Sequence, residues 1–194
     1  MIKAFVLAIG FWTQFVTANP SNQFYNFFTQ LETISANFTQ TIYDDNNTVL
    51  DISSGALIFK RPRQLFWHTK TPNEQILLLN NKELWLVDVE LEQANLQAIE
   101  DLAKTPLYYL INKPKLIKDM PKFSYSKAGI DWYSSPDRRI QFGFKNQQLY
   151  AISTTNDFGQ TILITFDQIE LAPNIQPNTF TLSLDKNFDI VKSF

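Results

Sequence analysis

The sequence predicts a mostly β protein of the α+β class, with one long antiparallel sheet and two or three helices to cover it. From Asn37 onward, short segments rich in Val, Ile, Thr, Phe, Tyr and Trp are separated by Asn, Asp and Pro, a pattern typical of antiparallel strands and their turns. Large apolar residues near the start of the chain follow a helical spacing. Residues 101–120 break the β rhythm and indicate a helical insertion.

The first 18 residues have the features of a secretory signal peptide. One positive charge at Lys3 precedes an apolar stretch, and small residues come before Asn19, which is the order found in signal peptides. The apolar stretch contains Thr13 and Gln14 and is shorter than the roughly 20 residues of a membrane-spanning helix. We therefore expect a signal peptide at residues 1–18 and not a membrane anchor, followed by a single domain over residues 19–194.

The composition excludes several classes of function. The 194-residue chain contains no cysteine and one histidine, His68, which rules out disulfides, thiol nucleophiles, thiolate zinc sites and multi-histidine metal centres. Its formal charge of -2 provides no overall basic field for a nucleic acid. We expect no metal, no cofactor and no nucleic-acid partner, and the composition favours binding over covalent catalysis.

The apolar residues near the start predict one amphipathic helix. Phe24, Phe27, Phe28 and Leu31 fall on one face, after helix-start residues at positions 20 and 21. Four large apolar side chains on one face need an apolar surface to cover them. The strands that follow are expected to supply that surface.

The β segments predict twelve strands joined by short turns. Turns are expected at residues 45–47, 80–81 and 146–147, where Asn tolerates a positive φ angle. The predicted strands are residues 36–44, 49–60, 64–70, 74–80, 83–89, 92–99, 122–128, 130–134, 138–145, 148–156, 160–171 and 179–184.

Several of these strands are apolar on both faces. In residues 83–89, Trp85 and Val87 point one way while Leu84 and Leu86 point the other. Residues 138–145 instead alternate apolar and polar side chains, as expected for a strand with one wet face. A long curved sheet with an aromatic inner face and few covering helices favours an apolar hollow, although a packed core would produce nearly the same pattern.

The insertion at residues 101–120 is predicted to form a short helix that folds back over the sheet. Pro106 is expected to begin a new turn and Pro114 to end the helix. The residues expected on its apolar side are Leu102, Leu107, Tyr108, Leu110 and Ile111.

Short motifs follow one another over nearly the whole chain after residue 18. An F-x-Q signal at residues 38–40 is followed by G-x-L and R-P signals within residues 55–62, and Leu65 precedes Phe66 and Trp67. Further motifs are Leu84-Trp85, Thr105-Pro106, residues 157–161 and residues 180–182. Each motif is weak alone, but their order and spacing resemble, fairly specifically, those of the LolA family of outer-membrane lipoprotein carriers. Leu65 stands where the family usually has phenylalanine, and Asn80-Asn81 and Lys186-Asn187 replace the family's Asp-Gly and Pro-Gly turns.

The resemblance implies an incomplete antiparallel β-barrel closed by a helical lid. It also implies a periplasmic chaperone, not an enzyme, that holds lipoprotein acyl chains as a monomer. The expected partners are outer-membrane lipoproteins, an ATP-driven inner-membrane release complex and an outer-membrane lipoprotein receptor. The chain has no phosphate-binding G-x-x-x-x-G-K-[ST] loop, so the energy for extraction has to come from the release complex.

The resemblance further implies a role for Arg61. The family's arginine at this place points inward and hydrogen-bonds backbone carbonyls of the lid, which keeps the lid closed until lipid enters. A guanidinium offers five donors, and the carbonyls at a helix end can accept them. The alternative is a surface arginine that ends a strand before Pro62.

An acyl-chain cavity is expected between the apolar strand positions and the lid. For the strand residues the alternative is packing in an ordinary core, and the two roles are compatible. The lid-helix candidates are Leu107, Tyr108, Leu110 and Ile111, and the cavity candidates are Leu57, Phe59, Leu65, Trp67, Trp85, Phe142 and Ile164.

Two other functions remain open from the sequence. One is the outer-membrane receptor that shares this fold, although that receptor is anchored through a lipid-modified cysteine and this chain has none. The other is an enzyme acting on lipid or glycan, for which the chain lacks a G-x-S-x-G nucleophile motif. We interpret His68 as a structural histidine and the carboxylates Asp44, Asp45, Asp88 and Glu90 as turn and surface residues, so no catalytic site is expected.

Overall fold

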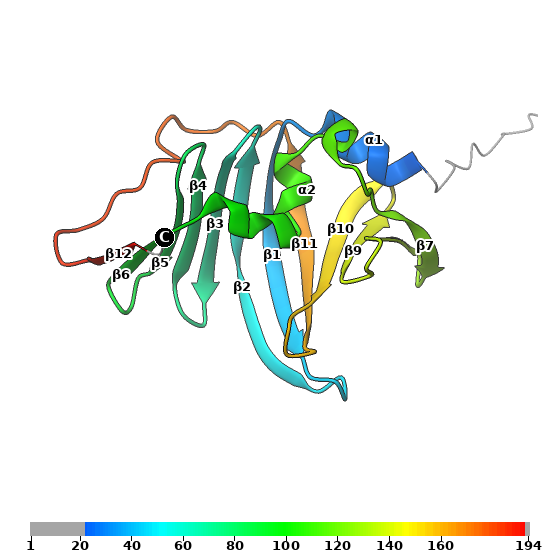
Figure 1. Cartoon of the computed structure of the whole chain (residues 1–194), viewed down its shortest axis with the longest axis horizontal. Coiled ribbons are helices and arrows are strands. Elements are labelled where there is room, and N and C mark those ends of the chain that lie inside the picture. The colour runs from blue at the N-terminus through cyan, green and yellow to red at the C-terminus, as the bar shows by residue number, and fades with distance from the viewer. Residues whose placement is uncertain (1–21, 193–194) are drawn as a thin grey trace, which may run out of the picture.

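The protein forms one open, curved sheet of twelve strands with its helices on the concave side (Figure 1). The computed structural model describes residues 22–192 and, within them, every side chain except those of Glu100, Asp101 and Lys104. The predicted signal peptide at residues 1–18 lies outside the described residues. No helix in residues 22–192 combines the length and the hydropathy that a membrane span requires.

The strands are joined in the order β12-β6-β5-β4-β3-β2-β1-β11-β10-β9-β8-β7. Neighbouring strands are antiparallel apart from β12, which runs parallel to β6. The two outermost strands, β12 and β7, do not pair with each other, so the barrel is incomplete, as expected. The strands are β1 (Thr33–Tyr43), β2 (Val49–Lys60), β3 (Gln64–Thr71), β4 (Gln75–Asn80), β5 (Leu84–Asp88), β6 (Gln93–Gln97), β7 (Lys122–Lys127), β8 (Ile130–Ser134), β9 (Ile140–Lys145), β10 (Gln148–Thr155), β11 (Thr161–Leu171) and β12 (Asp189–Lys192).

Helix α1 (Gln23–Gln30) covers one end of the concave face with the predicted apolar stripe. Phe24 and Phe28 are almost completely buried. The ring of Phe24 lies 5.1 Å from that of Phe142, and the ring of Phe27 lies 5.4 Å from that of Phe144, both on β9. Burial of each such phenylalanine stabilises the fold by about 2 kcal/mol.

The insertion is helical, but it forms three short pieces in place of one helix. They are the 3-10 helix η2 (Ile99–Lys104), α2 (Leu107–Ile111) and the 3-10 helix η3 (Pro114–Leu116). Pro106 begins α2, as predicted. The backbone N–H and the hydroxyl of Thr105 both bond to the carbonyl of Leu102, which ends η2 just before it.

Eleven predicted strands are present, and the predicted strand at residues 179–184 is wrong. That segment runs outside the sheet as turns and irregular backbone, and the last strand is β12. Its apolar residues Phe180, Leu182 and Leu184 pack against the outer face of the sheet. They alternate because one side of the segment faces the sheet, although no strand pairs with it. The turn prediction is confirmed by positive φ angles at Asn47, Asn81 and Asn146.

The register gives the sheet two separate apolar faces. On β2 to β5, Leu57, Trp67, Leu77 and Leu86 pair in one row across the sheet. The next row pairs Ile58, Phe66, Leu78 and Trp85, whose side chains point to the opposite face because side chains alternate along a strand. The first row belongs to the concave core with α1 and α2, and the second row packs under the segment around Phe180.

The close approach of β2 to β3 requires a glycine at position 55. A Cβ atom on Gly55 would lie 1.9 Å from the carbonyl oxygen of His68, which is backbone and cannot rotate away. We expect Gly55→Ala to lower the free energy of unfolding by about 3 kcal/mol, because the two strands must separate. Urea unfolding followed by circular dichroism measures this loss.

Gly159→Ala is the matched control, since Gly159 has a φ angle of +79° and a Cβ atom there would meet nothing within 4 Å beyond its own chain neighbours. Its cost should be limited to backbone strain of about 1 kcal/mol. Equal stability of the two variants would contradict the proposed close packing at Gly55.

Candidate functional site

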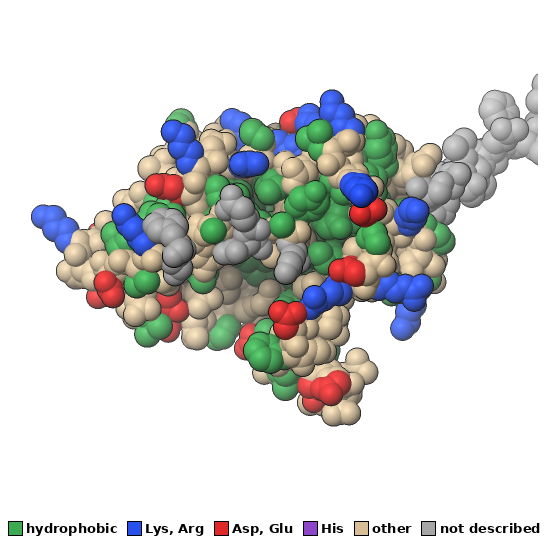
Figure 2. Space-filling view, in the orientation of Figure 1, with side chains coloured by type: hydrophobic (Ala, Val, Ile, Leu, Met, Phe, Trp, Pro, Cys, Tyr) green, Lys and Arg blue, Asp and Glu red, His purple; other side chains and the backbone are tan. Residues whose placement is uncertain are grey.

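An apolar cavity of about 290 Å³ lies between the concave face of the sheet and α2. Leu57, Trp67, Leu77 and Leu86 form its floor on β2 to β5. Figure 2 shows apolar side chains gathered around a hollow near the centre of this face. Among the described residues, the polar side chains of the lining are those of Gln40, Thr69 and Gln75. The cavity therefore offers a dry, apolar surface with a few hydrogen-bonding groups.

The second half of the wall comes from the strands on the other side of β1. Gln40 pairs with Ile164 on β11, and Ile164 pairs with Ile152 on β10, so these three side chains share the concave face. Trp67 is held in place by Phe38, whose ring centroid lies 4.3 Å away at an interplanar angle of 35°. The wall is thus built from strands that are far apart in the sequence.

The lid residues of α2 divide between the cavity and its surroundings. Leu107 and Leu110 line the cavity together with Pro106. Tyr108 and Ile111 are partly buried and pack against the core without lining the cavity. The two buried residues of α2 are Leu110, which the sequence predicts, and Tyr109, which it does not. The ring of Tyr109 packs against those of Phe24 and Phe142.

The predicted cavity residues divide in the same way. Leu57, Trp67 and Ile164 line the cavity. Three other predicted residues belong to the packed core and not to the cavity wall. Phe59, Leu65 and Phe142 are at most 1% exposed and do not reach the cavity surface.

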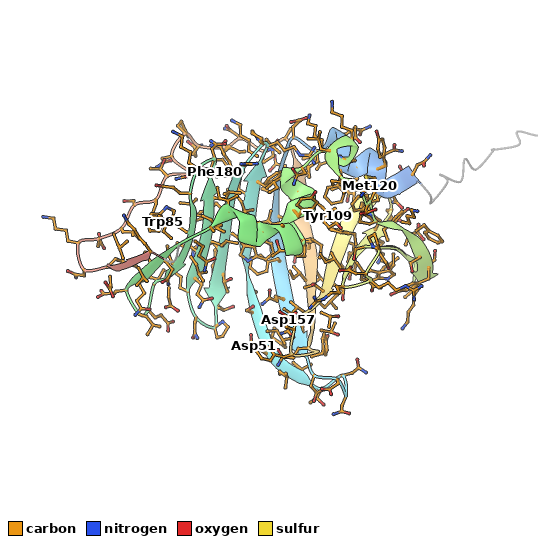
Figure 3. All side chains as sticks on the ribbon, in the orientation of Figure 1. Asp51, Trp85, Tyr109, Met120, Asp157 and Phe180 are labelled. Atoms are coloured by element: carbon orange, nitrogen blue, oxygen red, sulfur yellow. The ribbon has the colours of Figure 1, made fainter. Side chains whose placement is uncertain are left out.

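Trp85 does not belong to the cavity, and its prediction as a lining residue is wrong. It lies on the outer face of the sheet with Leu78 and Phe180, and Figure 3 shows Trp85 and Phe180 far from Tyr109 of the lid. Its indole N–H donates to Glu83 Oε2 at 3.1 Å. The lining residue of β5 is its neighbour Leu86, which sequence alternation places on the opposite face from Trp85.

Arg61 connects the end of β2 to the carboxyl end of α2. Its Nε donates to the carbonyl oxygen of Leu110 at 3.0 Å, and Nη2 donates to that of Asn112 at 3.4 Å. The side chain is buried, and the residue is only 7% exposed. The last carbonyls of a helix lack partners within the helix and carry its negative dipole end, so a cation is well placed here. The expected contacts between Arg61 and lid carbonyls are therefore present.

The guanidinium of Arg61 is incompletely satisfied. Its Nη1 is buried and has no hydrogen-bond partner among the described residues. Burial lowers the pKa of Arg61, and the negative charge of Glu32 partly opposes that shift. The closed contact between β2 and α2 thus retains the cost of a buried, unused donor.

Glu32 joins this contact from the turn between α1 and β1. Its carbonyl accepts the backbone N–H of Arg61 at 2.8 Å, and its Oε1 accepts a hydrogen bond from Lys113 Nζ at 2.5 Å. Lys113 follows α2 directly, so the ion pair holds the same end of the lid as Arg61. The hydrogen bond from Lys113 and the charges of Lys113 and Arg61 lower the pKa of Glu32.

The remaining titratable candidates have structural partners. His68 Nε2 lies 2.7 Å from Glu74 Oε1. Asp44 Oδ1 accepts the backbone N–H groups of residues 46 and 48, and Asp88 Oδ1 accepts that of Leu91. Among the side chains that the structure describes, no group of three is positioned to hold a metal ion. These contacts agree with the interpretation of His68, Asp44 and Asp88 as structural residues.

The chain is similar in sequence and in fold to known proteins over most of its length. A curated "Outer-membrane lipoprotein carrier protein" of Pseudomonas paraeruginosa is 26% identical over 200 residues, which cover 97% of this chain and 96% of the relative. A protein of the same name from Hahella chejuensis is 27% identical, with 84% and 83% covered. An uncharacterized conserved protein from Thermus thermophilus shares the fold, with a TM-score of 0.52 at 8% identity and coverage of 86% and 94%.

The family described as "Outer membrane lipoprotein carrier protein LolA" matches residues 29–183. The matched range includes every strand from β1 to β11, the lid and Arg61. The chain therefore belongs to the LolA family.

Proposed function

We propose that the protein is a periplasmic carrier that shields the acyl chains of outer-membrane lipoproteins in the cavity under α2. The observation that carries this proposal is the apolar cavity between the sheet and a lid of short helices. Each CH₂ group removed from water contributes about 0.8 kcal/mol, so a long acyl chain left in water costs on the order of 10 kcal/mol. A cavity lined by Leu, Ile and Trp side chains offsets that cost without recognising the protein part of the cargo.

The lid is built so that it can move away from the cavity. The helix α2 has five residues, and η2 and η3 are 3-10 helices. Helices this short are not stable alone and depend on tertiary contacts. A lid held by Tyr109, Leu110 and the Arg61 contacts can therefore be displaced by an acyl chain that replaces the apolar contacts.

Transfer requires partners because a carrier of this kind binds its cargo without consuming energy. We infer that an ATP-driven inner-membrane release complex loads the protein and that an outer-membrane receptor unloads it. Relatives are named as outer-membrane lipoprotein carriers, which supports a role in lipoprotein transport. The protein acts as a monomer, with no cofactor and no catalytic step.

Arg61 acts as the latch of the empty state. Lid closure satisfies two of its donors with the carbonyls of Leu110 and Asn112. Cargo that raises the lid breaks these bonds, and closure after release restores them. The latch therefore favours the empty state and helps to release the cargo to the receptor.

A polar group in the cavity floor should weaken acyl-chain binding. We expect Leu86→Asn to lower the affinity for a fluorescent acyl probe about 30-fold, because an amide without a partner in the occupied cavity costs about 2 kcal/mol. Probe titration followed by fluorescence measures the affinity.

Leu91→Asn makes the same chemical change at a leucine that is 67% exposed in the turn between β5 and β6. This control should bind the probe like the unmodified protein. Equal affinity of the Leu86 and Leu91 variants would show that the cavity does not hold acyl chains.

Loss of the latch should affect release more than binding. We expect Arg61→Leu to bind acylated lipoprotein but to transfer it about 10- to 100-fold less favourably, because hydrogen bonds from a charged donor contribute about 1.5–3 kcal/mol to the closed state. Transfer of radiolabelled lipoprotein to membranes that contain the receptor is the measurement. Arg63→Leu, at a neighbouring exposed arginine, is the control, and normal transfer by the Arg61 variant would remove the latch from the mechanism.

Acid should loosen the end of the lid through Glu32. The pKa of Glu32 is lowered from 4.5 by its contacts in the closed state. Because the pKa is lower in the closed state, the ionised carboxylate stabilises closure at any pH above its ordinary pKa. This stabilisation of the closed state is lost as the pH falls through the lowered pKa. We expect hydrogen-exchange protection of residues 107–113 to decline on acidification.

Glu32→Gln should remove this pH dependence, and protection in the variant should be lower near neutral pH. Glu170→Gln, at an exposed position on β11, is the control and should keep the profile of the unmodified protein. Parallel profiles for all three proteins would contradict a role for Glu32 in closure.

A further inference from the structure

The end of the molecule that carries β7 has a basic surface that the carrier cavity does not use. Residues 113–145 contain eight Lys and Arg against three Asp, a formal charge of +5. Because the whole chain has a charge of -2, the rest of it carries -7. Figure 2 shows several Lys and Arg side chains at this end. The charge is therefore strongly segregated within a chain that is acidic as a whole.

Several of these cations are not neutralised by the protein. Lys113 pairs with Glu32, and Arg139 pairs with Asp157. Among the described residues no ion pair includes Lys118, Lys122 or Arg138, and all three are exposed. Their charge is available to a partner.

Two of the cations meet in an open groove of about 230 Å³. Lys122 at the start of β7 and Arg138 in the β8–β9 turn line it, together with Met120, Phe123 and Ser124. Phe123 is 41% exposed, and Met120 is labelled in Figure 3. The groove therefore combines two positive charges with apolar side chains that are open to solvent.

A second groove extends the basic surface toward the lid. Ser135 and Pro136 belong to the walls of both grooves, and Lys118 lies in the second. Asp119 and Asp137 also line this groove, so the two grooves together carry three cations and two carboxylates. The surface remains basic on balance across both grooves.

We propose that this end of the molecule is a docking surface for an anionic phospholipid bilayer. Lys and Arg side chains close to an anionic leaflet each strengthen binding about fivefold. The exposed aromatic ring of Phe123 (41% exposed), which lines the first groove, sits favourably at the boundary between headgroups and acyl chains. The combination of free cations with an exposed ring fits the polar and apolar layers of a membrane surface.

The structure of β7 favours a bilayer over an added peptide strand. β7 is an edge strand, but its pairing with β8 is interrupted between Phe123 and Tyr125, and lysines stand at both of its ends. Such irregularities and edge lysines disfavour pairing with another strand. A bilayer surface needs no backbone register, so these features do not oppose it.

Binding is tested by cosedimentation of the protein, purified after export and removal of its leader, with lipid vesicles. The probe is vesicles that contain phosphatidylglycerol, compared with vesicles of phosphatidylcholine alone. We expect binding only to the anionic vesicles at low salt, and its loss near 1 M salt, where the Debye length falls to about 3 Å. The assay needs neither lipoprotein nor the cavity, so the inference can fail or succeed independently of the carrier function.

The double variant Lys122→Gln, Arg138→Gln should lower binding to the anionic vesicles about 30-fold. The control Lys82→Gln, Lys186→Gln makes the same change in net charge at exposed positions outside residues 113–145 and should bind normally. Thermal unfolding checks that all variants remain folded. Equal binding by the two double variants, equal binding to both kinds of vesicle, or no binding to the anionic vesicles would each overturn the proposal.

Discussion

The concave face of the sheet is more apolar and more extensive than the short helices of this chain can cover, and the cavity follows from that mismatch. The helix α1 fills one end with Phe24 and Phe28, which pack against the aromatic residues of β8 and β9. The row through Leu57, Trp67 and Leu77 is left beneath α2, which has only five residues. Interiors normally pack without voids of this size. A space that the protein leaves free is therefore available to an apolar ligand, and the fold stays open because β7 and β12 do not close the barrel.

We infer that the Arg61 contact makes closure of this space reversible. A buried guanidinium that satisfied all five donors would fix the lid, whereas an arginine with only solvent-exposed partners would contribute little to closure. Arg61 lies between these limits, because Nε and Nη2 are bonded to the lid while Nη1 is buried without a partner among the described residues. The free energy of closure is thus a small difference between hydrogen bonds gained and a buried donor left unused. A small difference suits a lid that must respond to the arrival and departure of a ligand.

The elements of the fold could be predicted from local pattern, but their assignment to faces could not. Alternation along residues 83–89 correctly separates Trp85 from Leu86, yet it does not say which of the two faces the cavity. That choice depends on the segment around Phe180, which covers the outer face and buries Trp85 there. The same segment alternates like a strand without joining the sheet. The contacts of Arg61 followed from the family resemblance, whereas Glu32 and Lys113 were missed because 81 residues separate them in the sequence.

The basic surface near β7 was not predicted from the sequence because the net charge is a sum over the whole chain and hides local clusters of charge. A charge of -2 predicts no basic field, but screening limits electrostatic attraction to about 8 Å at physiological salt. A surface that approaches β7 therefore meets Lys122 and Arg138 and is largely screened from acidic residues more than this distance away. Two or three such cations contribute about 1 kcal/mol each, which is too little for stable attachment. If the protein travels between two membranes as proposed, attachment of this strength would orient the molecule at a surface and still allow it to leave.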